Sequence, residues 1–308
     1  MKLPELKLPE SLNYIAAFFT MQCHLACGFC INANDESTDR KELFNKDRRV
    51  LPVADWIRII NRIPCRDDLP ITAQGGEPLM YKGFGEVLDK CGHYFDLLTA
   101  FPVSAKYFAG IVGQNIGAFT RPAPYPSIRV SYHPGQNVIT DIVKKCVELN
   151  DYGFFVSDDK SKTNVGIWMV AHPDNVIPTV QTDVYFETKE FLGVHNGVTY
   201  GAYKYPNATD AEVTKSCECK TSELLIDPMG RVFQCHAFLY NHWLGKEEFD
   251  PIGSMLDPEF TMDIVDQFRP CTHYGHCSPC DVKIKNNRFQ SLYDTDTAHC
   301  SVEIRNIK

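Results

Sequence analysis

The sequence feature that most constrains the fold of this chain of 308 residues is a group of three cysteines directly after an apolar run. Cys23, Cys27 and Cys30 make a C-x3-C-x2-C pattern after the apolar run 14–19. A four-iron cluster normally takes four thiolates, so a loop that supplies only three leaves one iron able to bind another molecule. A zinc site is the alternative, and it requires a fourth cysteine or histidine. His24 adjoins Cys23 too closely to complete such a site easily.

The composition excludes several classes of protein. No stretch approaches the roughly 20 apolar residues of a membrane span, and residues 1–9 lack the layout of a signal peptide. Thirteen cysteines without a secretory signal indicate a reducing, cytoplasmic location and metal ligation in place of a disulfide framework. The net charge of −8 disfavours non-specific binding to nucleic acid, which requires a cationic surface.

A second motif, the run QGGEP at 74–78, follows the short strand-like segment 69–73. Together with the three cysteines it resembles the radical S-adenosylmethionine (SAM) enzymes. In that family the residue before the third cysteine is aromatic and packs near the adenine of SAM, and Phe29 stands there. The GGEP loop of the family holds the amino group of SAM through backbone carbonyls, and glycine lets the backbone approach closely. The resemblance therefore implies SAM-binding roles for Phe29, Gly75, Gly76, Glu77 and Pro78.

Strands and helices are expected to alternate along the first two thirds of the chain. This alternation predicts right-handed βαβ crossovers and a parallel sheet. Periodicity alone does not separate a barrel from a doubly wound sheet, but the resemblance implies a partial (β/α)6 TIM-like barrel over residues 1–210. Strands are expected at 14–19, 69–73, 96–100, 127–132, 165–172 and 182–191, and helices at 51–63, 83–94, 105–119 and 136–149.

Two polar residues stand at the end of the expected strand 127–132. Parallel α/β folds bind ligands at the carboxyl ends of their strands, so Ser131 and His133 are candidate site residues. The resemblance implies that Ser131 contacts the ribose or carboxylate of SAM. His133 is the candidate catalytic residue, and the alternative is a loop histidine bonded to backbone.

The last third of the chain holds seven cysteines between residues 217 and 300, and 223–235 is expected to form a β-hairpin. The order of a cysteine, a Gly-x4-Cys hairpin and a later C-x2-C pair resembles the SPASM/twitch extension of radical SAM enzymes. This resemblance implies a small auxiliary-cluster domain at 211–308 with one auxiliary [4Fe–4S] cluster, and a zinc site remains the alternative. The expected ligands are Cys219, Cys235, Cys277 and Cys280, with Cys217, Cys271 and Cys300 as alternates.

The resemblance also implies an activity. An enzyme of this kind cleaves SAM to a 5′-deoxyadenosyl radical that abstracts a substrate hydrogen, while an auxiliary cluster accepts or relays an electron. Only 22 residues precede Cys23, too few for a domain that grips a leader peptide, so a small-molecule substrate is expected. A peptide or protein modifier that epimerises or crosslinks is the alternative, and a non-enzymatic metal-binding scaffold is a third interpretation. A flavodoxin- or ferredoxin-type protein is the expected electron donor.

Overall fold

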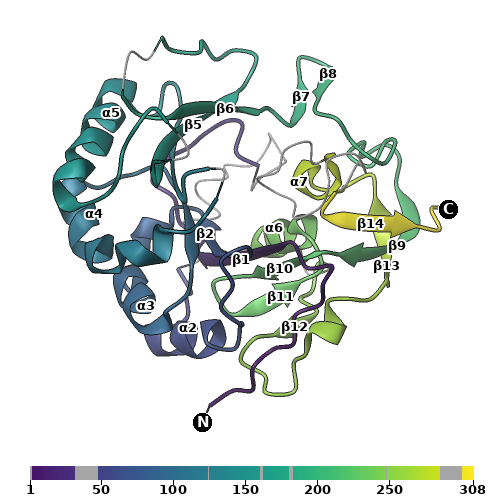
Figure 1. Cartoon of the computed structure of the whole chain (residues 1–308). Coiled ribbons are helices and arrows are strands. Elements are labelled where there is room, and N and C mark those ends of the chain that lie inside the picture. The colour runs from purple at the N-terminus through teal and green to yellow at the C-terminus, as the bar shows by residue number, and fades with distance from the viewer. Residues whose placement is uncertain are drawn as a thin grey trace.

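A nine-stranded sheet runs through the centre of the molecule, and helices cover its outer side (Figure 1). The computed structural model describes residues 2–31, 48–123, 125–159, 162–179, 183–246, 248–284 and 300–308. Six successive strands pair in parallel, as the alternation of strands and helices predicts. They are β1 (Tyr14–Thr20), β2 (Ile71–Gly75), β3 (Phe95–Thr99), β4 (Ile128–Tyr132), β5 (Val165–Ala171) and β6 (Phe186–Glu190).

Four α-helices connect the first five strands and pack on the outer side of the sheet. Among the described residues, no helix lies between β5 and β6, so the last crossover departs from the expected alternation. The helices are α2 (Val53–Ile60), α3 (Phe84–Cys91), α4 (Ala105–Val112) and α5 (Ile139–Glu148).

The helix expected at 105–119 is α-helical only in its first half. Ser104 caps its start, because its hydroxyl accepts a hydrogen bond from the backbone N–H of Tyr107 at 3.2 Å. At Gly113 the chain tightens into the 3₁₀ helix η2 (Gly113–Phe119). Glycine lowers helix propensity, and three glycines within eight residues explain why the α-helix does not continue.

The hairpin expected at 223–235 is present, but it belongs to the central sheet. Its strands are β10 (Glu223–Ile226) and β11 (Arg231–Phe233), and β10 pairs in parallel with β1. With β12 (Gly253–Ser254), the strand order is β12-β11-β10-β1-β2-β3-β4-β5-β6. The structure therefore shows a mixed α/β fold with a parallel central sheet that takes strands from both sides of residue 210. The division at that residue stays a prediction.

The helix α6 packs on the open side of the sheet, against β1 and β10, through one apolar group, whereas η3 packs with α4 and α5 on the outer side. A second sheet has the order β13-β9-β14, and β7 pairs with β8 as a short hairpin. The remaining elements are β7 (Gly193–His195), β8 (Val198–Tyr200), β9 (Lys215–Thr221), β13 (Arg269–Tyr274), β14 (Val302–Arg305), α6 (His236–Trp243), α7 (Pro279–Val282), and the 3₁₀ helices η1 (Pro78–Met80), η3 (Leu149–Tyr152) and η4 (Met262–Ile264).

The two faces of the central sheet differ in polarity because side chains alternate along each strand. On the helix-covered face, Phe19 of β1 packs on Trp56 of α2 with ring centroids 4.4 Å apart, and both are fully buried. Burial of one such side chain contributes about 1.5–3 kcal/mol. On the other face, Asp96 of β3 and Arg129 of β4 are charged although both are buried. That polar face carries the candidate site.

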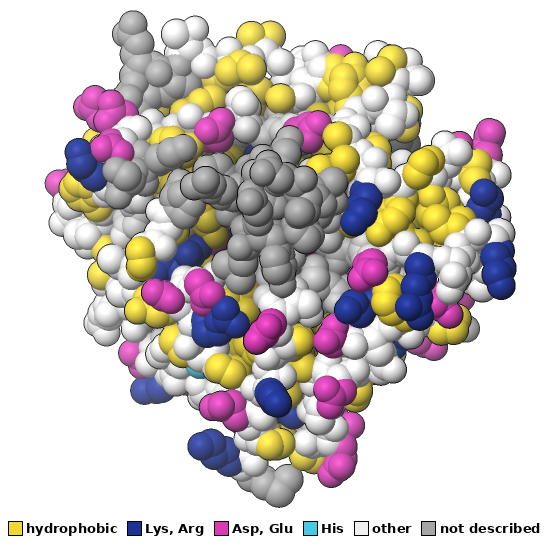
Figure 2. Space-filling view, turned by 45° about the vertical axis from the view of Figure 1, so that its right-hand side comes forward, with side chains coloured by type: hydrophobic (Ala, Val, Ile, Leu, Met, Phe, Trp, Pro, Cys, Tyr) yellow, Lys and Arg dark blue, Asp and Glu magenta, His cyan; other side chains and the backbone are white. Residues whose placement is uncertain are grey.

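The described surface carries charged side chains of both signs, as the composition predicts. On the face shown in Figure 2, Lys and Arg side chains are interspersed with Asp and Glu. None of the helices among the described residues has both the length and the apolar character needed to cross a bilayer.

Candidate functional site

A cavity of about 920 Å³ lies at the carboxyl ends of the parallel strands. The cysteine loop borders it on one side, and the ends of β2 to β6 border it on the others. The strand register places residues of successive strands side by side in this wall, since Thr72 pairs with Asp96 and Val170 with Lys189. The fold therefore brings both sequence motifs to one space, where parallel sheets bind ligands.

The three loop cysteines all face this cavity and are half-buried. The loop is shaped by its own backbone, since the N–H of Cys30 donates to the carbonyl of Cys27 at 3.1 Å. The N–H of Leu25 also donates to Cys23 Sγ at 3.4 Å, a contact that suits a thiolate. Burial, with the nearby Cys30 and Cys23 thiols, raises the pKa of Cys27 to about 12. Without a cation the Cys27 thiol therefore holds its proton, and a metal would replace that proton.

The sulfur atoms of these three cysteines are less closely grouped than ligands of a single ion would be. Among the described residues, the groups whose ligand atoms all lie within 4.8 Å of one another do not include Cys23, Cys27 and Cys30. Thiolates that bind separate irons of one cube point outward from different corners and need such separation. Three spaced thiols beside a cavity fit a cluster with one open iron.

The GGEP loop is hydrogen-bonded directly to the cysteine loop. Gly76 N donates to Thr20 O at 2.9 Å, and Glu77 N donates to Gln22 O at 2.7 Å. A Cβ on Gly76 would lie 2.1 Å from Gln22 O, and Gly75 has φ +131°. These contacts give the glycines a packing role, and the close approach to SAM that the sequence predicts for them stays a prediction. The glycines are required because the cysteine loop occupies the space where a side chain would stand.

The Glu77 carboxylate is occupied by its own surroundings. One oxygen accepts from Leu79 N at 3.0 Å and from Thr99 Oγ1 at 2.7 Å, and the other accepts from Ala100 N at 2.7 Å. Burial raises the pKa of Glu77 to about 7, while these donors oppose the rise. Glu77 therefore ties the loop to the end of β3, and Pro78 starts the 3₁₀ turn η1 behind it. The SAM contacts predicted for both residues stay predictions.

Phe29, Ser131 and His133 line the same cavity. The ring of Phe29 lies 5.6 Å from that of His133 and 5.5 Å from that of His172. His133 Nδ1 is buried and has no hydrogen-bond partner among the described residues, while its backbone N–H donates to Asn137 Oδ1 at 2.8 Å. Burial, with the nearby His24, lowers the pKa of His133 to about 4. The imidazole is therefore neutral near pH 7.

The cavity wall also holds charged residues that the sequence interpretation missed. Asp96 accepts from Arg121 at 3.0 Å, from Arg129 at 2.9 Å and from the Tyr125 hydroxyl at 2.8 Å. Lys189 has no carboxylate within ion-pair distance among the described residues, and burial with Arg129 and Lys283 lowers its pKa to about 7. For Asp96 and Arg129 the available signal was an ionisable residue inside a largely apolar strand, whereas Lys189 lies in the polar strand β6.

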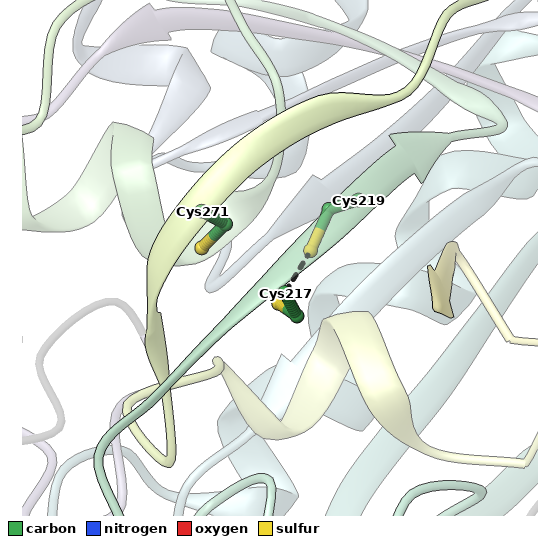
Figure 3. A group of neighbouring side chains, drawn as sticks. All are labelled: Cys217, Cys219 and Cys271. Atoms are coloured by element: carbon green, nitrogen blue, oxygen red, sulfur yellow. Dashed lines mark hydrogen bonds between the residues drawn. The ribbon is translucent and has the colours of Figure 1, made fainter. Parts of the chain in front are cut away.

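Three cysteines of the C-terminal part meet on the second sheet (Figure 3). Cys217 and Cys219 are two residues apart on β9, so their side chains share a face, and their sulfurs are 3.4 Å apart. Cys271 of β13 pairs directly with Cys217. All three are buried, and their sulfurs lie within 4.8 Å of one another. Hydrogen bonds from Cys217 and Cys219 lower the pKa of Cys271, while the hydrogen bonds of Cys219 with the other two thiols raise its own pKa.

This trio differs from the ligand set expected from sequence. Of the four expected ligands only Cys219 belongs to it, while Cys235 and Cys277 pack against the apolar cluster that contains the trio. Cys280 lines the cavity, where Lys283 and Lys189 act on its pKa, although burial still raises that pKa to about 12. Two of the alternates, Cys217 and Cys271, complete the trio, and the third, Cys300, donates to Val302 O at 2.8 Å.

Comparisons with known proteins give likenesses to solved structures. No protein-family model matches the chain, and no curated protein sequence matches it. A structure of SuiB from Streptococcus suis has a TM-score of 0.40 at 15% identity, over 74% of this chain and 61% of that chain. A second, SuiB bound to the precursor peptide SuiA, has a TM-score of 0.35 at 18% identity, over 53% of this chain and 34% of that chain. The chain thus spans about a third to three fifths of the length of these proteins.

Proposed function

We propose that this protein is a radical SAM enzyme with a partial (β/α)6 core. The observation that carries the proposal is the direct hydrogen bonding of the three-cysteine loop to the GGEP loop at one end of a cavity. The volume of this cavity, about 920 Å³, is at the upper end of the 300–1,000 Å³ that is usual for ligand sites. When bound there, a four-iron cluster and SAM supply a 5′-deoxyadenosyl radical.

The residues of this chain would hold and orient those groups. Cys23, Cys27 and Cys30 provide three thiolates, and the neighbouring cavity leaves room for a molecule at a fourth coordination position. The rings of Phe29 and His133 form an adjoining wall that limits water near the reacting atoms. Because His133 is neutral, its ring can accept a hydrogen bond from a hydroxyl or amino group.

The buried C-terminal trio is proposed as a second metal centre, in a SPASM/twitch-like region at 211–308. An auxiliary [4Fe–4S] cluster is the centre implied by the sequence resemblance, with Cys235 or Cys277 as a further ligand beside Cys217, Cys219 and Cys271. A single zinc ion is the alternative, since tetrahedral thiolates at 2.3 Å from zinc are about 3.8 Å apart. The 3.4 Å contact of Cys217 with Cys219 is nearer to that geometry. Metal analysis distinguishes the two.

The substrate proposed is a small molecule that enters the cavity and loses a hydrogen atom, in an oxidation or a rearrangement. Peptides belong in the same screen, because the resemblance to radical SAM enzymes includes peptide modifiers that epimerise or crosslink. Electrons would come from a flavodoxin- or ferredoxin-type protein, and the location is proposed to be cytoplasmic.

The test is reductive cleavage of SAM. Protein reconstituted anaerobically with iron and sulfide should convert SAM and a strong reductant to 5′-deoxyadenosine, measured by chromatography. Replacement of Cys23, Cys27 and Cys30 by Ala should lower the yield to that of a protein-free control. Cys65→Ala is the matched control, because Cys65 is exposed and lies outside the cavity wall. A triple variant that still forms 5′-deoxyadenosine would refute the proposal.

A further inference from the structure

Two histidines and an aspartate meet at the end of β5, behind the ring of Phe29. His172 follows β5 directly, Asp174 stands in the next turn, and His195 ends β7. We infer that His172, Asp174 and His195 bind a divalent first-row transition metal ion of the zinc class. This site is separate from both cysteine groups and does not depend on SAM chemistry.

The spacing of the ligand atoms suits one ion. His195 Nε2 lies 3.1 Å from Asp174 Oδ1, and His172 Nδ1 lies 3.8 Å from Asp174 Oδ2. One ligand atom from each residue lies within 4.8 Å of the other two. Ligands at 2.0–2.2 Å from one ion are separated by about 3.0 Å in octahedral and about 3.4 Å in tetrahedral geometry. The observed contacts of 3.1 and 3.8 Å lie on either side of the tetrahedral value, and the shorter one is close to the octahedral value.

The hydrogen bonds around the two imidazoles show what an ion would replace. Asp174 N donates to His172 Nδ1 at 3.2 Å, so this nitrogen is an acceptor. His195 Nε2 lies 2.9 Å from Asn196 Nδ2 and 3.1 Å from Asp174 Oδ1, and the tautomer of the ring decides which of these contacts is a hydrogen bond. A cation bound between the two ring nitrogens and the carboxylate would replace these hydrogen bonds.

The rings are already held in place. His172 contacts Phe29, Phe191 and His195, with ring centroids 5.5, 4.6 and 4.6 Å apart, respectively. The His172 and His195 side chains are 14% and 20% exposed, while Asp174 is 68% exposed, so an ion can enter from solvent. Such preorganisation lowers the entropic cost of binding.

Two imidazoles and one carboxylate define the class of ion. Imidazole suits zinc, copper, iron and nickel, and a 2-His-1-carboxylate set leaves coordination positions open. Water or a substrate oxygen could occupy those positions. The ion would also join the β7–β8 hairpin to the end of β5, and through His172 to the ring of Phe29 in the cavity wall.

Cobalt(II) is the probe for this site, because its absorption distinguishes thiolate from nitrogen and oxygen ligands. Protein whose cysteine sites have been filled with iron and sulfide should bind one further Co²⁺ per chain without a thiolate charge-transfer band. His195→Gln should abolish this binding, and Asp174→Asn should weaken it at least about tenfold. Zn²⁺ should displace the bound Co²⁺.

The matched control is Asp158→Asn, which removes another exposed carboxylate that does not contact a histidine among the described residues. Thermal melting of each variant checks that it folds. The Co²⁺ binding result does not depend on whether the protein cleaves SAM. Equal Co²⁺ affinity in the wild type and in both site variants would overturn the inference. Failure of the filled wild-type protein to bind non-thiolate Co²⁺ would overturn it as well.

Discussion

The two cysteine groups use the same side chain in opposite ways. Cys23, Cys27 and Cys30 lie on a half-buried loop beside a cavity, and their sulfurs are spread out. Cys217, Cys219 and Cys271 lie buried on two paired strands, with their sulfurs within 4.8 Å of one another. A loop sets the positions of its thiols through backbone turns and can leave one side open. A strand pair fixes them through register and leaves little space around the ion.

This difference in setting predicts a difference in role. An exposed metal position beside a cavity can bind a substrate or cofactor, whereas a metal enclosed by protein ligands supports the fold or carries electrons. Each group can be tested separately, because one lies on the loop after β1 and the other lies on the β13-β9-β14 sheet.

The largest loss of iron and of SAM cleavage is expected from Gly76→Val. Its Cβ would lie 2.1 Å from Gln22 O and 2.4 Å from Met21 O, both in the backbone that leads into the cysteine loop. The variant should lose about four irons per chain and all SAM cleavage, while the C-terminal metal is kept. Iron quantitation and 5′-deoxyadenosine assays measure this. Gly110→Val is the control, since no heavy atom lies within 4 Å of its added Cβ. Full iron content with loss of SAM binding alone would instead place Gly76 against SAM.

A smaller, complementary effect is expected from Cys271→Ser. The change removes one ligand of the enclosed trio, so the variant should lose the C-terminal metal and keep the loop cluster and SAM cleavage. Loss of about four irons would identify a cube, and loss of one zinc would identify a single ion. Cys65→Ser provides the control at an exposed cysteine. Unchanged metal content in Cys271→Ser would remove the trio as a metal centre and end the comparison.

The smallest effect concerns Lys189, in the cavity wall that the cysteine loop borders. Its pKa is about 7 in the folded protein and about 10.4 when unfolded, so the unfolded chain binds more protons between these values. The free energy of unfolding should therefore rise with pH across this window. Lys189→Met should remove that rise and stabilise the metal-free protein near pH 7 by about 1–3 kcal/mol.

Urea denaturation near pH 7 and near pH 10 measures the effect of Lys189→Met, and the gain should shrink at the higher pH. Lys144→Met is the control, because the Lys144 side chain is 77% exposed and pairs only at 4.0 Å with Glu148. An equal gain at both pH values would show that the Lys189 ammonium is not destabilised by burial.

The sequence predicted the parallel part of the fold well, because buried strands and amphipathic helices have distinct periods. It also placed Cys23 and the GGEP run at strand ends. It did not predict that β10 joins β1, since nothing in the run 223–226 indicates which edge it will pair with. The grouping of Cys217 with Cys271 depends on the register of β9 against β13, which no local pattern encodes. The His172 site was missed for the same reason, since His195 belongs to another strand.

The pairing of β1 with β10 has a consequence for how the protein is made. Residues 14–17 pair with residues 223–226, so one edge of β1 stays without its partner until most of the chain has been synthesised. At 5–20 residues per second, that interval lasts roughly 10–40 s. During it the nascent chain exposes an apolar strand edge next to the cysteine loop, and unpaired edges favour aggregation.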